Sequence, residues 1–137
     1  MKACPALDLD FEITPADAER LSEVCGELVD EVRKNKDSYE KSSDAAKVLA
    51  RVENPVAVPF LMKALEANPM VDSIVIPAIE RIGDKDAVRF LISLLEKNDS
   101  SSSRYELVRP ALVRLKKRSA FEEAELIRIA LVRFPAP

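Results

Sequence analysis

The chain has 137 residues and a formal net charge of −3, which allows one domain with its own hydrophobic core. Only 2 glycines, 5% aromatic residues and many strong helix formers favour an all-α fold. The absence of histidine excludes Ser-His and Cys-His nucleophile pairs as well as imidazole metal ligands. We therefore predict a non-enzymatic protein, with no catalytic residues, no metal and no cofactor.

The start of the sequence carries no charged-then-apolar leader, and no run of eighteen apolar residues follows anywhere in the chain. We expect a cytoplasmic protein that does not enter a membrane, or an exported one if a leader was removed. Two cysteines, Cys4 and Cys25, fit no metal-ligand spacing. They are expected to be free thiols, and a disulfide that ties the start of the chain to the first helix is the alternative.

Residues 1–14 are predicted to form an extended arm. Between Leu7 and Ile13, apolar residues alternate with acidic ones, which is the pattern of a strand. An isolated strand in a helical protein either lies over the first helices or pairs with a partner or a second copy.

A helix from about 15 to 35 follows, because Thr14 is a capping residue and Pro15 suits the first helical position. Its apolar stripe faces one way and its acidic side chains the other, as in a helix that caps a helical array. Residues 1–31 hold nine acidic and two basic side chains, whereas residues 104–137 hold eight basic and four acidic ones. In a solenoid this asymmetry predicts an acidic end and a basic end.

The middle of the chain repeats itself, because residues 48–65 match residues 78–95 at an offset of thirty positions. A period of this length is typical of stacked helical repeats. It assigns Val52, Phe60, Ile82 and Phe90 to the stacked interior. After the first helix, we expect helices over about 41–52, 55–67, 69–82, 85–97, 104–117 and 120–133.

The second copy of the repeat, Ala78-Ile-Glu-Arg-Ile-Gly-Asp-Lys-Asp-Ala-Val-Arg-Phe-Leu-Ile-Ser-Leu-Leu95, resembles the short HEAT-like repeat that is also found in phycobilin lyase subunits. The resemblance implies a right-handed α-α superhelix. It also implies a single repeat domain over 15–137, with units at about 38–67, 69–97 and 104–133. Proteins of this type mostly bind partners, so the resemblance implies a protein-interaction scaffold.

In such repeats the second helices line a concave surface, where we expect the partner to bind. The residues predicted to project from it are Asp72, Ile76, Tyr105, Arg109 and Val113. Two arginines of a repeated position complete the candidate site, Arg81 and Arg114. The repeated arginines either form a row of cations for an acidic partner or bond the loops between helices, with Asn54 and Asp84 as acceptors.

Two further functions stay open at this point. The basic C-terminal half suggests binding of anions or nucleic acids through Arg81, Arg109, Arg114 and residues 116–118. The resemblance to lyase subunits suggests a non-catalytic subunit of a lyase-type complex. The last helix is apolar on almost every side, so we expect it to be buried on several sides. A homo-oligomer formed through this helix or through the N-terminal strand is one way to bury it, and coverage by a further domain or by the N-terminal arm is the alternative.

Overall fold

The computed structural model of the chain describes residues 15–136, so the predicted arm and Cys4 lie outside the described residues. These residues form two compact units, which divide between Ala78 and Ile79. All regular elements from residue 15 to residue 136 are helical, which confirms the all-α prediction for that part of the chain. The superhelix and the single domain stay predictions.

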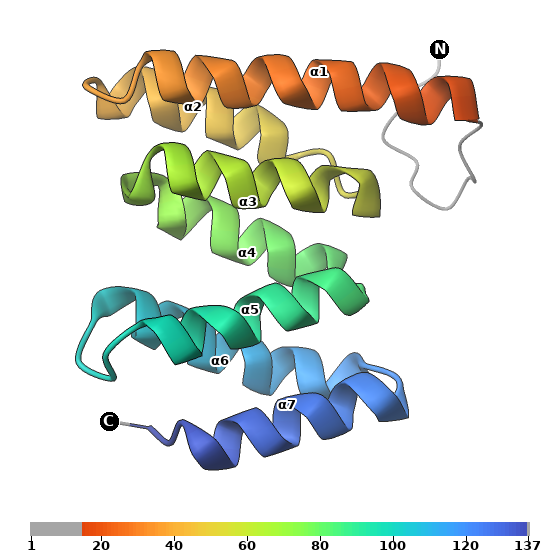
Figure 1. Cartoon of the computed structure of the whole chain (residues 1–137), viewed down its shortest axis with the longest axis vertical. Helices are drawn as coiled ribbons and strands as arrows, with labels where there is room; N and C mark the ends of the chain where they lie inside the picture. The colour runs from red at the N-terminus through yellow and green to blue at the C-terminus, as the bar shows by residue number, and fades with distance from the viewer. Residues whose placement is uncertain (1–14, 137) are drawn as a thin grey trace. The chain divides into compact units, whose positions relative to one another are not determined.

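The first unit contains α1 (Pro15–Lys34), α2 (Tyr39–Ala50) and α3 (Val58–Ala67). Helix α1 packs against both α2 and α3 (Figure 1). Helix α4 (Asp72–Ile82) begins in this unit and ends in the next. The second unit continues with α5 (Lys85–Lys97), α6 (Ser103–Arg118) and α7 (Phe121–Arg133), and α6 packs against both α5 and α7.

Most of the observed helix ends lie within two residues of the predicted ones. One difference recurs. Two of the predicted helices begin with a short 3-10 helix, Pro55–Ala57 before α3 and Pro69–Val71 before α4. In each, an asparagine side chain accepts a hydrogen bond from the backbone N–H only two residues later, and its carbonyl accepts one from the third. This tight bonding around an N-terminal proline favours the narrower 3-10 turn.

The boundary between α4 and α5 forms as the repeat predicts. Gly83 has a φ of 60°, the left-handed conformation that ends α4. Asp84 then caps α5, because its Oδ1 accepts a hydrogen bond from the N–H of Ala87 at 2.9 Å. The roles of Gly83 and Asp84 involve only backbone groups within four positions in the sequence. The local sequence is therefore enough to predict where α4 ends and α5 begins.

The repeat period misplaces part of the core. Val52, Phe60, Ile82 and Phe90 were predicted to be interior, but all four are only partly buried. Leu61 and Leu91, one residue after the two phenylalanines, are fully buried instead. A period alone does not determine the rotation of a helix about its axis, and a shift of one residue turns the buried side by about 100°.

Cys25 is a free thiol whose side chain is fully buried in the first unit. Burial disfavours the thiolate and so raises the pKa of Cys25 above its usual value. We therefore expect Cys25 in a Cys4→Ser variant to resist a disulfide reagent in native buffer and to react fully in denaturant. Absorbance of the released thiolate measures this, and rapid reaction of the native protein would contradict the burial.

Candidate partner-binding surface

The seven residues of the predicted site do not form one exposed surface. Arg81 and Arg114 are exposed, and Asp72, Arg109 and Val113 are partly exposed. Ile76 and Tyr105, however, are only 1% and 3% exposed. The prediction that these two side chains project outward is therefore wrong.

Ile76 is covered because the buried side of α4 is wider than the repeat pattern suggests. The buried residues of this stretch are Val71, Val75, Ile76, Ala78 and Ile79. Around the helix axis they cover an arc of about 160°, which without Ile76 would be about 100°. Burial of one more aliphatic side chain removes further apolar surface from water. An isoleucine in this register is therefore a core residue rather than a contact for a partner.

Tyr105 and Arg109 of α6 bind the C-terminal end of α7. The Tyr105 hydroxyl donates to the carbonyl oxygen of Pro135 at 2.7 Å. Arg109 donates from Nε to the carbonyl of Phe134 at 2.9 Å and from a terminal nitrogen to the carbonyl of Leu131 at 3.3 Å. The last carbonyls of a helix lack partners within the helix and carry partial negative charge, so a guanidinium satisfies both needs. The two residues thus hold the end of the chain in place.

Arg114 lies on the exposed side of α6 and is held by Glu80 near the end of α4. Both side chains belong to the second unit, and two parallel hydrogen bonds of 2.9 Å join them. The hydrogen bond to Glu80 raises the pKa of Arg114 above its usual value. The Arg114 side chain is 60% exposed, whereas that of Glu80 is 14% exposed. Arg114 is therefore fixed in direction yet open to a partner.

The acceptor predicted for the arginines is different for Arg114. Asp84 and Asn54 were expected to bind them, but both side chains cap the helices that follow. Arg114 instead uses the Glu80 carboxylate, and Arg118 donates to the backbone carbonyl of Glu80. Three arginines of the basic half, namely Arg109, Arg114 and Arg118, thus already donate to acceptors in the protein. This arrangement reduces the support for a phosphate-binding row.

A shallow groove of about 620 Å³ in the first unit was not predicted. It lies between α1 and α3, and its lining residues are Glu23, Gly26, Glu27, Val29, Asp30, Arg33, Phe60 and Lys63. Gly26 lies next to the Phe60 ring, since a Cβ there would be 3.8 Å from Cε1 of Phe60, and the Lys63 ammonium lies over the same ring at 5.5 Å from the centroid. The sequence signal for the groove was a glycine within an otherwise regular amphipathic helix. The groove is lined by three carboxylates and two cations, so its charge is mixed.

Helix α7 is less buried than its composition predicts. Ile127 and Ala130 are buried, but Phe121, Leu126, Ile129 and Val132 are 40% to 80% exposed. Within the second unit, α5 and α6 cover only one side of this helix, so its burial on several sides stays a prediction that depends on a further cover. Its remaining apolar side is called the α7 outer face below, with Phe121, Leu126, Ile129 and Val132 as its members.

Two general features of the described residues bear on function. From residue 15 to residue 136, no three His, Cys, Asp or Glu side chains gather in a way that would hold a metal ion. In the same part of the chain, no helix is both long and apolar enough to cross a membrane.

Comparison with known proteins agrees with the helical repeats. A family model described as HEAT repeats matches residues 15–119. No curated protein and no solved structure matches the chain. The family match includes all of α6, the helix that carries Tyr105, Arg109 and Arg114, and it ends before α7. Since it extends over well more than half of the sequence, the chain belongs to the HEAT-repeat family.

Proposed function

We propose that this chain is a non-enzymatic interaction module that binds another protein through the outer side of α6. HEAT repeats generally serve as protein-interaction scaffolds, and the family is typically non-catalytic. The outer side of α6 consists of Pro110, Val113, Arg114 and Lys117, which follow one another at helical spacing and are exposed or partly exposed. Of the predicted site, it retains Val113 and Arg114.

The observation that supports this surface best is the fixed position of Arg114. Arginine is enriched at the centres of protein interfaces, where its planar group binds carboxylates through two bonds. A flexible side chain loses conformational entropy when it binds, but Glu80 already orders Arg114 before any partner arrives. Beside it, Val113 and Pro110 supply apolar contact area. The chemistry fits a partner with acidic side chains around an apolar centre.

The binding test uses a partner recovered by affinity capture from the source cells and then purified. Arg114→Gln is expected to weaken binding about tenfold, which corresponds to about 1.4 kcal/mol. Glu80→Gln keeps the arginine but removes its second charge-assisted bond, so we expect a smaller loss. Isothermal titration calorimetry measures both effects.

Arg89→Gln is the matched control, because Arg89 is an exposed arginine at the start of α5 in the same unit. It should bind as the wild type does, and thermal melting should show all three variants folded. Equal affinity of Arg114→Gln and Arg89→Gln for every partner would disprove the proposed surface. Asp72 and Arg81 remain predicted contacts that the same titration can test.

The two other functions make different predictions in the same experiments. Binding of anions or nucleic acids would show a steep loss of affinity with added salt, because each neutralised phosphate releases counterions. A non-catalytic subunit of a lyase-type complex, similar to the phycobilin lyase subunits, would be captured together with a catalytic partner. The internal bonds of Arg109 and Arg118 to backbone carbonyls leave less of the basic half for a row of phosphate contacts, which favours the protein-binding function.

A further inference from the structure

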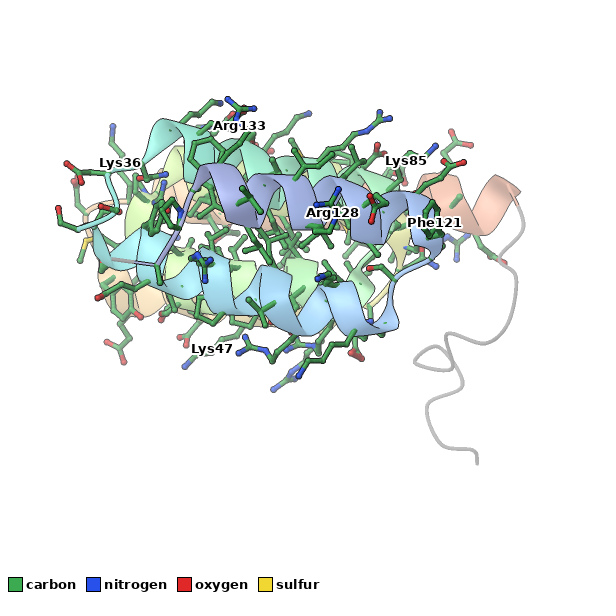
Figure 2. All side chains as sticks on the ribbon, turned by 90° about the horizontal axis from the view of Figure 1, so that it is seen from below. Lys36, Lys47, Lys85, Phe121, Arg128 and Arg133 are labelled. Atoms are coloured by element: carbon green, nitrogen blue, oxygen red, sulfur yellow. The ribbon has the colours of Figure 1, made fainter. Side chains whose placement is uncertain are left out.

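The α7 outer face is the most apolar exposed surface in the described part of the second unit. Phe121 is 80% exposed, Val132 71%, Ile129 47% and Leu126 40%. Figure 2 looks onto this helix, with Phe121 near one end, Arg133 near the other and Arg128 between them. Burial of apolar surface is favourable in proportion to its area, so such a face gains stability from a cover.

Two members of this face, Phe121 and Val132, lie at the ends of a line of residues whose order is symmetric. Phe121, Glu125, Arg128 and Val132 follow at spacings of four, three and four, which places them on one side of the helix. The two charged residues in the middle already interact, since Arg128 lies 3.0 Å from a carboxylate oxygen of Glu125. Read from either end, the line runs from an apolar residue through two opposite charges to another apolar residue.

This symmetry identifies the cover that fits best. If a second copy of α7 lies antiparallel on the first, Phe121 faces Val132 of the second copy and Glu125 faces Arg128 of the second copy. The two-fold axis then passes between Leu126 and Ile127, and each contact occurs twice, as in other two-fold interfaces. A parallel arrangement would instead place like charges opposite each other. We propose that two copies of this chain associate through antiparallel packing of their α7 outer faces.

The interface is small, and this sets the expected strength. A helix of 13 residues is about 20 Å long, so one helix pair buries less area than a standard stable complex. We expect a weak dimer that forms at micromolar or higher concentration. The proposed dimer uses α7, whereas the proposed protein-binding surface lies on α6, so each proposal stands or fails separately.

Charge reversal tests both the pairing and its direction by sedimentation velocity over a range of concentrations. The wild type should shift from monomer to dimer as its concentration rises. Arg128→Glu brings four acids together at the two-fold axis, and Glu125→Arg brings four bases together, so each variant alone should remain a monomer. A one-to-one mixture of the two variants should dimerise again, because the acidic copy then faces the basic copy.

The matched control is Arg33→Glu, because Arg33 and Asp30 form an exposed ion pair of the same spacing on α1. This variant should dimerise as the wild type does, and circular dichroism should show that all variants keep their helices. Val132→Glu, at an exposed apolar position, is a second route to the monomer. A wild type that stays monomeric throughout, a dimer that survives Arg128→Glu, or a mixture that stays monomeric would each overturn the proposal.

Discussion

Gly83→Ala should lower the free energy of unfolding by roughly 2 to 4 kcal/mol, as measured by urea denaturation. Gly83 has a φ of 60°, where a side chain is strained, and a Cβ there would lie 2.8 Å from Cδ1 of Leu115 and 3.1 Å from the carbonyl oxygen of Glu80. Leu115 is 1% exposed, so its methyl group has little room to move. Backbone strain and overpacking therefore add.

Gly26→Ala is the matched control and should have the opposite sign. Gly26 lies within α1, and a Cβ there would meet only Cε1 of Phe60 at an ordinary contact distance of 3.8 Å. Alanine in a helix interior is favoured over glycine by roughly 0.5 to 1 kcal/mol, so stability should rise. If the two units unfold in separate transitions, Gly83→Ala should affect the one from residues 79–137. Equal stability of the two variants would refute the steric argument.

Arg109→Met should lower the free energy of unfolding by about 2 kcal/mol in the same measurement, because hydrogen bonds to charged groups contribute about 1.5 to 3 kcal/mol. Methionine keeps much of the aliphatic stem but leaves the carbonyls of Leu131 and Phe134 without their donor. Tyr105→Phe removes the single bond to Pro135, so its expected cost is about 1 kcal/mol.

The control for this pair is Arg114→Met, because Arg114 lies on the same helix but is 60% exposed. An exposed ion pair contributes little, so this variant should lose no more than about 1 kcal/mol. The opposite ranking, with Arg109→Met unchanged in stability but weakened in partner binding, would return Arg109 to the interface that the sequence predicted.

The contrast between Gly83 and Arg109 shows what kind of feature can be predicted. Gly83, Asp84, Asn54 and Asn68 act on backbone groups within four residues, so their neighbours in sequence are enough to assign them. Arg109 acts on carbonyls 22 and 25 positions later in the chain. By the repeat register, Arg109 holds the position in its unit that Ile76 holds one unit earlier, but equal register does not imply equal surroundings when the next helix differs.

The candidate site likewise has features that the sequence predicts and features that it does not. Val113 and Arg114 were predicted to be exposed and are at least partly so, since a helical period identifies the side opposite the buried leucines. The pairing of Arg114 with Glu80 and the groove beside Gly26 depend on contacts between helices. No spacing within one helix contains that information.

By itself, the sequence determined the helices, their caps and their membership of a repeat, because these follow from local hydrogen bonding and from hydrophobic periods. Only the tertiary structure decided that Ile76 and Tyr105 are buried, that Arg109 holds the end of α7, and that α7 keeps an apolar face exposed. The physical reason is that a helix has several sides that can be covered. Which of them is buried depends on neighbours that are distant in sequence, and on whether a further helix packs there.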